Sequence, residues 1–122
     1  MTAISDSDRE SIVTTALDYY EGWFGGDAAR MERALHPQLA KRGLVRPPDI
    51  ELDGFRDMVD ATAAGLGRRK DPGEDLRIHV DVDHVHGDIA TAAVTSTVFV
   101  DYLQLVRIDG AWTILNALWA RA

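Results

Sequence analysis

The chain has 122 residues and a mass of 13.4 kDa, enough for one hydrophobic core, so we expect a single domain over residues 1–122. It contains no cysteine, which excludes disulfides, a thiolate nucleophile and cysteine-ligated metal centres. Its 20 Asp and Glu outnumber 13 Lys and Arg, and the net charge of -7 argues against a nucleic-acid partner. The sequence shows neither a membrane-spanning apolar run nor a signal-peptide pattern, so we expect no membrane association and a cytoplasmic location.

The basic residues are concentrated in the middle of the chain. Residues 36–70 hold seven bases and five acids, whereas both flanking segments are acidic. We interpret this excess as a solvated loop rim, and a patch that attracts an anionic ligand is the alternative. The residues concerned are Lys41, Arg42, Arg46, Arg68, Arg69 and Lys70.

A long helix is predicted to begin near Ser7 and to end at Gly25-Gly26. Ser7 and Glu10 have the spacing of a capping box, in which each side chain bonds a free amide of the other residue. Apolar residues repeat at helical spacing in two adjacent rows, which indicates one buried face. The rows are Ile12, Ala16, Tyr19 and Trp23, and Val13, Leu17, Tyr20 and Phe24.

A shorter second helix is predicted after Asp27, which can cap its first turn. His36-Pro37 should end this helix, because the residue before a proline disfavours helical backbone. Residues 39–45 then have the composition of a short strand, interrupted by Pro47-Pro48.

The second half of the chain is predicted to be mostly sheet. Asp53 should cap a third helix, which is followed by a loop over residues 65–75 that is rich in Gly, Pro and charge. Turn signals at Gly87-Asp88 and Asp109-Gly110 separate the later strands. Helices followed by an antiparallel meander predict an α+β fold. The expected strands cover residues 76–85, 89–99, 100–108 and 111–120.

Two segments carry a resemblance to a known family. The C-terminal string DYLQLVRIDGAWTILNALWARA resembles the closing hairpin of the putative lumazine-binding, or SnoaL-like, branch of the nuclear transport factor 2-like superfamily. The earlier string ALDYYEGWFGGDAARMERALHPQLAKRGL resembles the opening helix pair of the same branch. This resemblance implies a cone-shaped fold with three N-terminal helices against a curved, mainly antiparallel sheet, and a pocket at the wide end. The superfamily includes isomerases, dehydratases, polyketide cyclases and binding modules, so the fold alone does not name the chemistry.

The ketosteroid isomerase branch of this superfamily implies candidate catalytic residues. Its helix-one tyrosine corresponds to Tyr19, its protonated aspartic acid to Asp101 and a pocket-wall tryptophan to Trp119. Its base position falls at Arg42 or Gly43, and neither residue can accept a proton.

A carboxylate from a neighbouring segment could replace this base. Asp49 and Glu51 could serve only if the Pro47-Pro48 segment folds inward, and we expect both to lie outside the cone. The sequence therefore favours a site with an acid and without a base.

The turn type of the last hairpin decides which residues share a face with Asp101. A two-residue turn would place Asp101 beside Trp112, Ile114 and Asn116. A glycine bulge at Gly110 would instead place it beside Leu115, Ala117 and Trp119. We favour the bulge, because the resemblance requires Asp101 and Trp119 on one face.

Asp101 shares its face with leucines in either arrangement, and a carboxylate there is costly unless it is neutral or hydrogen-bonded. It is therefore a candidate catalytic residue together with Tyr19, and the alternative is a structural carboxylate bonded to an amide. The predicted ligand pocket comprises Tyr19, Trp23, Phe55, Val59, Phe99, Asp101, Leu103, Leu115, Ala117 and Trp119.

Three function classes remain open. The first is a protein that binds a small hydrophobic or aromatic ligand, which the missing base favours. The second is an isomerase, cyclase or dehydratase acting on a hydrophobic carbonyl or polyketide-like substrate, and the third is a structural or dimerisation module. We expect a homodimer formed through the outer sheet face, because both faces of the later strands carry apolar residues.

No cofactor or metal is expected. The string HVDVDHVHGD is rich in metal-ligating residue types, but strand alternation directs Val80 and Val82 to the core and His79, Asp81 and Asp83 to solvent. We interpret this segment as a solvated strand edge.

Overall fold

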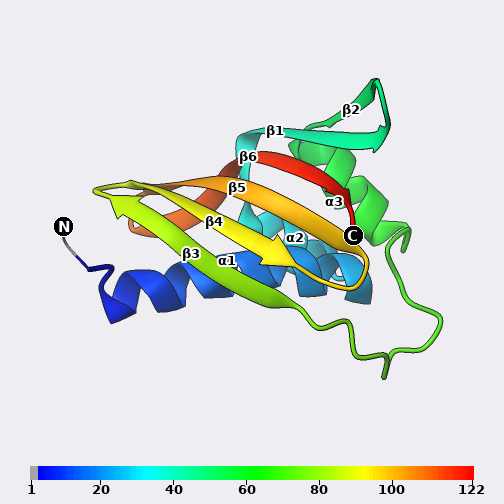
Figure 1. Ribbon diagram of the computed structural model, residues 1–122, viewed down its shortest axis with the longest axis horizontal. Helices are drawn as coiled ribbons and strands as arrows, with labels where there is room; N and C mark the ends of the chain where they lie inside the picture. Colours follow the sequence, from blue (N-terminus) through cyan, green and yellow to red (C-terminus); the bar gives the residue numbers. More distant parts are fainter. Residues whose placement is uncertain (1–2) are drawn as a thin grey trace.

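The computed structural model describes residues 3–122, which form two helices, two strands, a third helix and then four strands. The arrangement confirms the predicted α+β fold (Figure 1). Among these residues no helix is long and apolar enough to cross a bilayer. The elements are α1 (Asp6–Gly25), α2 (Ala28–Ala34), β1 (Leu35–Arg46), β2 (Asp49–Asp53), α3 (Phe55–Ala63), β3 (His79–His86), β4 (Ile89–Thr95), β5 (Phe99–Ile108) and β6 (Ala111–Arg121).

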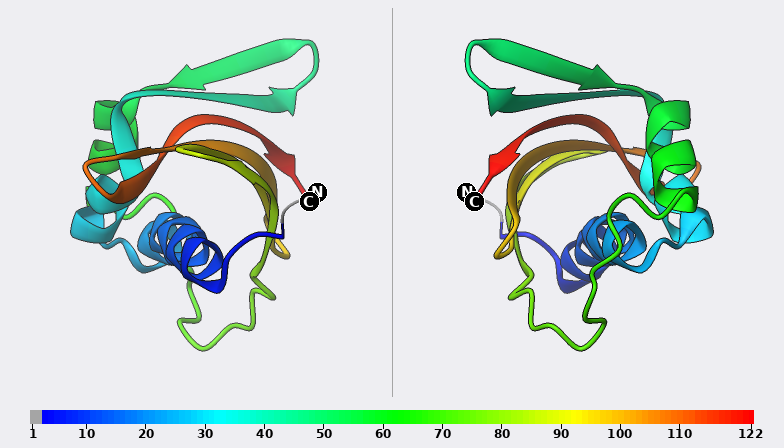
Figure 2. Two further views of the ribbon diagram at one scale, coloured as in Figure 1. Left: turned by 90° about the vertical axis from the view of Figure 1, so that its left-hand side faces the viewer. Right: turned by 90° about the vertical axis from the view of Figure 1, so that its right-hand side faces the viewer.

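The strands form one sheet in the order β2-β1-β6-β5-β4-β3. Neighbouring strands are antiparallel except for β1 and β6, which run parallel. The sheet curls around α1, which lies on its concave side, and the β1–β2 hairpin extends from one end (Figure 2). The core fills the space between the concave face and the helices.

The N-cap residue of the first helix lies two residues before Ser7. Ser5 is the N-cap residue, and its side chain accepts a hydrogen bond from the amide of Asp8, so the predicted capping box at Ser7 and Glu10 is wrong. At the other end Gly26 has a positive φ of 66°, the left-handed conformation that glycine adopts at low cost, and it ends α1 as predicted.

A buried ion-pair cluster fixes the corner between α1 and α2. Asp18 on α1 accepts hydrogen bonds from Arg33 at 2.9 Å and from Arg30 at 3.0 Å. Asp27 caps α2 as predicted, because its side chain accepts from the amide of Arg30. These contacts hold α2 against α1 and so set where β1 starts.

The structure extends the predicted strand at residues 39–45 and adds a partner for it. β1 runs from Leu35 to Arg46, and Pro47-Pro48 form the turn to β2, which the sequence did not predict. Gly54, rather than Asp53, is the N-cap residue of α3, and Asp57 accepts a hydrogen bond from its amide. The chain therefore turns back beside β1 before it enters α3.

The last hairpin has a two-residue turn and a separate bulge farther along β6. Asp109 and Gly110 form a two-residue turn with positive φ angles, so the predicted bulge at Gly110 is wrong. The register instead shifts farther along, where Leu115 is the extra residue between two paired positions. Beyond that shift Asp101 pairs with Trp119, which confirms that these two residues share a face.

Candidate functional site

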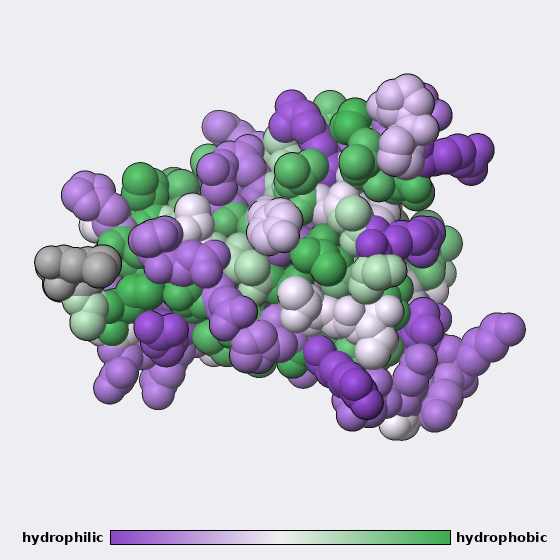
Figure 3. Space-filling view, viewed as in Figure 1, coloured by the Kyte–Doolittle hydropathy of each residue, from purple (hydrophilic) through white to green (hydrophobic). Residues whose placement is uncertain are grey.

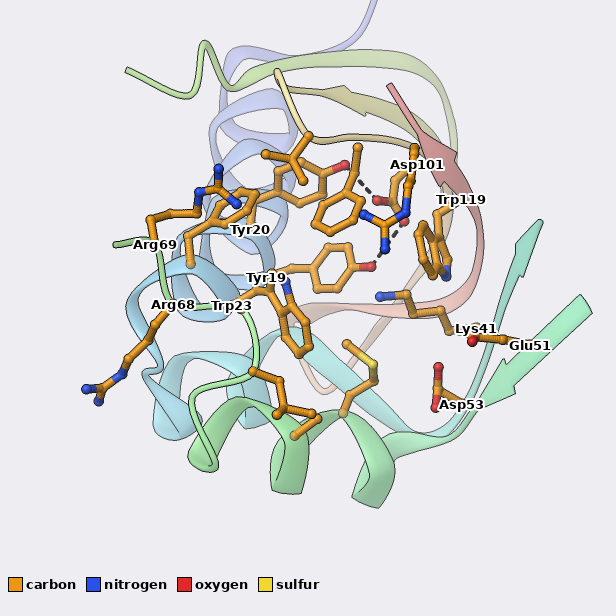
Figure 4. Close-up of a pocket in the computed structure, with 18 residues that line it drawn as sticks. Tyr19, Tyr20, Trp23, Lys41, Glu51, Asp53, Arg68, Arg69, Asp101 and Trp119 are labelled. Carbon is orange, nitrogen blue, oxygen red and sulfur yellow. Dashed lines mark hydrogen bonds between the residues drawn. The ribbon is translucent and has the colours of Figure 1, made fainter. Parts of the chain in front are cut away.

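A cavity of about 400 Å³ lies between α1, the β1–β2 hairpin, α3 with its following loop, and the ends of β5 and β6 (Figure 4). This volume lies within the range of about 300–1,000 Å³ that is usual for small-molecule sites. Its wall combines aromatic rings with charged groups. The lining residues are Tyr19, Tyr20, Trp23, Phe24, Lys41, Glu51, Asp53, Met58, Ala61, Leu66, Gly67, Arg68, Arg69, Val98, Phe99, Asp101, Trp119 and Arg121.

Asp101 lies at the inner end of the cavity and is only 2% exposed. The Tyr20 hydroxyl donates to its Oδ2 at 2.6 Å, and the Tyr19 hydroxyl donates to its Oδ1 at 3.1 Å (Figure 4). Burial raises the pKa of Asp101, although nearby Lys41 and the two hydroxyls oppose that shift. The residue is thus bonded by tyrosines, and the predicted structural alternative, a bond to an amide, is not what the structure shows.

Lys41 is the second charged group of the cavity and is 9% exposed. Its ammonium points between Tyr19 and Trp119, with Nζ 5.0 Å and 5.2 Å from the two ring centroids and 5.8 Å from that of Trp23 (Figure 4). Within residues 3–122 no carboxylate oxygen lies within 4.0 Å of Nζ, and no hydrogen bond to it is formed. The three rings therefore flank an ammonium that forms no hydrogen bond with the described residues and whose Nζ faces the cavity.

Burial lowers the pKa of Lys41, because the ammonium loses its hydration. Asp101, Asp53 and Glu51 oppose the shift through their charges, but they are too distant to form an ion pair with it. Aromatic faces also attract a cation, yet they cannot accept three hydrogen bonds as water does. Burial therefore favours the neutral amine of Lys41 and the neutral carboxylic acid of Asp101, compared with the same groups in water.

Two glycines make room for the indoles beside Lys41. A Cβ placed on Gly43 of β1 would overlap the ring of Trp119, and one placed on Gly67 would overlap the ring of Trp23. The Trp119 indole nitrogen is buried without a hydrogen-bond partner in the described part of the chain. The position of Trp119 is therefore set by packing against the backbone of Gly43.

Half of the residues predicted for the pocket line this cavity. Tyr19, Trp23, Phe99, Asp101 and Trp119 come together there from α1, β5 and β6 (Figure 4). The other five, Phe55, Val59, Leu103, Leu115 and Ala117, are not in its wall.

Each of these five residues has a specific reason to lie elsewhere. Val59, Leu103 and Ala117 belong to the closed part of the core, deeper in the cone. Phe55 is in the first turn of α3, where it packs at the edge of that core beneath Arg56. Leu115 is the bulge residue, and it lines a groove on the outer side of the sheet.

Six charged residues of the wall were not among the predicted pocket residues, and Lys41, Glu51 and Asp53 come from the β1–β2 hairpin. Lys41 was assigned to a solvated rim with its basic neighbours, but Leu39, Lys41 and Gly43 are the buried positions of an alternating strand, a pattern that could have revealed it. Glu51 was expected outside the cone, yet it lines the cavity together with Asp53. The unpredicted strand β2 is the reason, because it pairs Glu51 with Gly43 and Asp53 with Lys41.

The other members of the basic middle segment divide between two sides of the molecule. Arg68 and Arg69 line the cavity from the loop after α3, and Arg69 is paired with Glu74 at 2.8 Å. Arg42 instead lines a groove on the outer face of the sheet. The predicted rim is therefore not one continuous surface.

Comparison with known proteins gives a family and a fold. The model of the family described as "Putative lumazine-binding" matches residues 7–120. No curated protein sequence matches the chain. Among solved structures, an NTF-2-like protein of unknown function from Silicibacter pomeroyi DSS-3 superposes with a TM-score of 0.77 at 17% identity, covering 98% of this chain and 100% of the other.

Two further structures resemble the chain over nearly its whole length. An NTF2-like protein of unknown function from Methylobacillus flagellatus KT has a TM-score of 0.74 at 21% identity, with 98% of this chain and 95% of the other covered. A ketosteroid isomerase-like protein from Erwinia carotovora atroseptica has a TM-score of 0.67 at 11% identity, with 96% and 98% covered. At these identities the similarity concerns the fold. The family match shows that the chain belongs to the family described as "Putative lumazine-binding", and the similar structures show that it has the fold of NTF2-like proteins.

Proposed function

We propose that this protein binds a small, flat aromatic molecule that carries an oxygen acceptor, such as a ring carbonyl or a phenolic oxygen. The observation that carries this proposal is Lys41, a buried ammonium directed into the cavity with no acceptor for its N–H groups. The Nζ itself faces the cavity, because it is not among the atoms that are closed off from it. A ligand oxygen beside Nζ would therefore accept a charge-assisted hydrogen bond, the stronger kind in proteins.

The walls of the cavity support a flat ligand. Phe24 and Phe99 are stacked at 5.9 Å with an interplanar angle of 12°, and Phe99 meets Trp119 edge-on at 5.3 Å. Aromatic rings favour such stacked and edge-to-face contacts with another ring. The apolar body of the ligand would lie against these rings while its oxygen reaches Lys41.

Asp101 and Tyr19, the candidate catalytic residues predicted from the sequence, would complete the polar end. If Asp101 holds a proton, it can donate to one tyrosine, and that hydroxyl is then free to donate to the ligand. Burial favours the protonated carboxyl, as the raised pKa of Asp101 indicates. The site could thus present Lys41 and a tyrosine hydroxyl to one ligand oxygen.

The family description suggests a first ligand to test. Lumazine is a bicyclic pteridine with two ring carbonyls, and it has the flat shape and the acceptors that this cavity requires. A simpler probe is 2-naphthol, which has a bicyclic ring and a single phenolic oxygen.

The test is a titration of ¹⁵N-labelled protein with lumazine and with 2-naphthol, followed by NMR. We expect saturable chemical-shift changes at the backbone amides of Tyr19, Lys41 and Asp101, because these residues surround the polar end of the cavity. The amides of His86 and Ile89, at the far end of β3 and β4, should not shift. Shifts confined to the outer face, or no saturable shifts with either compound, would contradict the proposed function.

A further inference from the structure

The chain contains two lysines, and the structure places them in opposite environments. Lys41 is buried in the cavity wall, whereas Lys70 is exposed in the loop after α3. Lys41 is thus the one lysine that a molecule in the cavity could reach. Its Nζ has no hydrogen-bond acceptor among residues 3–122 that would hold it in a charged, unreactive state.

We infer that the Nζ of Lys41 captures an aromatic aldehyde or ketone as a covalent imine inside this cavity. The inference rests on the proposed function, since the aromatic part of the carbonyl compound must first bind between the rings. It goes further by assigning a reactive group and by narrowing the ligand to carbonyl compounds.

The reaction needs only groups that the site contains. The neutral amine attacks the carbonyl carbon, a C–N bond forms, and the carbonyl π electrons move to oxygen, which takes up a proton to become a hydroxyl. Nitrogen then loses a proton, the hydroxyl is protonated and leaves as water, and the C=N bond forms. The balance is amine plus carbonyl compound giving imine plus water, so no oxidant or reductant is required.

Groups that can supply and receive these protons face Lys41 from three elements. Asp101 on β5 and Tyr19 on α1 are hydrogen-bonded to each other at 3.1 Å, and Asp53 and Glu51 reach the cavity from β2. The raised pKa of Asp101 increases the share of its protonated form, and the lowered pKa of Lys41 increases the share of neutral amine.

The aromatic surroundings of Lys41 favour the product over the free ammonium. An ammonium has three N–H donors, and no side chain of residues 3–122 accepts a hydrogen bond from Lys41. A protonated imine keeps the positive charge but has a single N–H donor, so fewer donors remain unpaired after capture. The rings at 5.0–5.8 Å and the carboxyl of Asp101 can stabilise this cation as they do the ammonium.

The test is reductive trapping with 2-naphthaldehyde, an aldehyde with the same ring system as the 2-naphthol probe. The full-length protein is incubated with the aldehyde and sodium cyanoborohydride, digested, and analysed by peptide mass mapping. Lys70 and the N-terminal amine act as internal controls in the same sample. A parallel sample contains excess 2-naphthol, which should compete at Lys41 only.

We expect at least tenfold more naphthylmethyl adduct at Lys41 than at Lys70, and we expect 2-naphthol to suppress the Lys41 adduct alone. Equal labelling of the two lysines, or preferential labelling of Lys70, would overturn the inference. If 2-naphthol binds in the cavity but Lys41 stays unlabelled, capture is wrong and the proposed binding function stands. If neither binding nor labelling occurs, both proposals fail.

Discussion

Lys41 and Asp101 form a buried pair of ionisable residues that the fold keeps at a cost. Both residues are largely buried, and the two do not approach within ion-pair distance, so their attraction compensates only part of the lost hydration. Apolar residues of similar size would pack in these positions without that cost. Such an arrangement is typical of sites where chemistry or binding, rather than stability, requires the residues.

At the same scale, Gly43→Ala tests whether packing against β1 positions Trp119. The added methyl group would overlap the indole, so Trp119 must move out of the cavity wall. We expect a loss of about 1–3 kcal/mol in the free energy of unfolding, as for other overpacked sites, together with weaker 2-naphthol binding. Chemical denaturation followed by Trp fluorescence measures the first effect, and the NMR titration measures the second.

The matched control is Gly25→Ala at the end of α1, where a Cβ would meet nothing within 4 Å. This variant should leave probe binding unchanged and change the free energy of unfolding by less than about 1 kcal/mol. If Gly43→Ala behaves like Gly25→Ala, Trp119 is not held by Gly43.

The sequence was informative about some site residues and silent about others. Asp101 could be predicted because a lone carboxylate on an apolar strand face is unusual, and Tyr19 because it belongs to a helical apolar row. Lys41 was missed because it is adjacent to the exposed Arg42 in a basic segment. Only the strand alternation that begins at Leu39 shows that Lys41 lies on the buried face and Arg42 on the exposed face. Glu51 was missed because its position depends on a strand pairing between β1 and β2.

At the scale of elements, the corner between α1 and α2 depends on Asp18. Burial acts to raise the pKa of this carboxyl, but hydrogen bonds and charge from Arg33 and Arg30 outweigh it, so the pKa is lowered on folding. Because the pKa is lowered on folding, the ionised carboxylate of Asp18 stabilises the folded state at pH values above the pKa of an unfolded aspartic acid, near 3.9. This stabilisation is lost as the pH falls through the pKa of Asp18 in the folded state.

We therefore expect Asp18→Asn to reduce the free energy of unfolding by about 1–2 kcal/mol at pH 7, a moderate amount because Arg33 is largely exposed to solvent screening. The difference from the wild type should shrink below about pH 4, as Asp18 is protonated in the wild type. Urea denaturation at several pH values measures this. A difference that is independent of pH would contradict the role assigned to Asp18. The control is Asp83→Asn, because Asp83 is an exposed residue of β3. The free energy of unfolding of this variant should stay within about 0.5 kcal/mol of the wild type at every pH.

The order of elements could be predicted well because helical spacing, glycine and proline positions and strand alternation are local signals. The details that shape the cavity could not, because they depend on contacts between distant segments. The strand β2 is formed by exposed residues with little alternation, and its pairing with β1 follows from the turn at Pro47-Pro48. The bulge at Leu115 has no glycine to mark it, and it depends on the curvature of the sheet.

At the scale of the whole molecule, the outer face of the sheet carries exposed apolar side chains. Tyr102 on β5 is 61% exposed and Leu118 on β6 is 52% exposed, and these two residues are directly paired. Hydrophobic and hydrophilic patches alternate over the surface seen in Figure 3. We propose that this outer face joins two copies of the chain, because contiguous exposed apolar surface on a sheet favours association.

Sedimentation equilibrium at micromolar concentration should therefore show a species of twice the chain mass. Leu118→Asp should convert it to a monomer, since a charge would be buried in the contact. Leu66→Asp is the control, because Leu66 is exposed in the loop after α3, on the cavity side of the molecule and not on the outer face of the sheet. A wild type that remains at 13.4 kDa would contradict the proposed dimer.

The most direct test of the central claim, that Lys41 makes this cavity a binding site for an aromatic molecule with an oxygen acceptor, is a calorimetric titration with 2-naphthol. It compares the wild type with Lys41→Met and with Lys70→Met, which remove the same charge from the cavity and from an exposed loop. We predict saturable binding by the wild type and by Lys70→Met, and binding about tenfold weaker or more by Lys41→Met, as expected for the loss of a charge-assisted hydrogen bond. Equal affinity in all three proteins, or no binding by the wild type, would contradict this account.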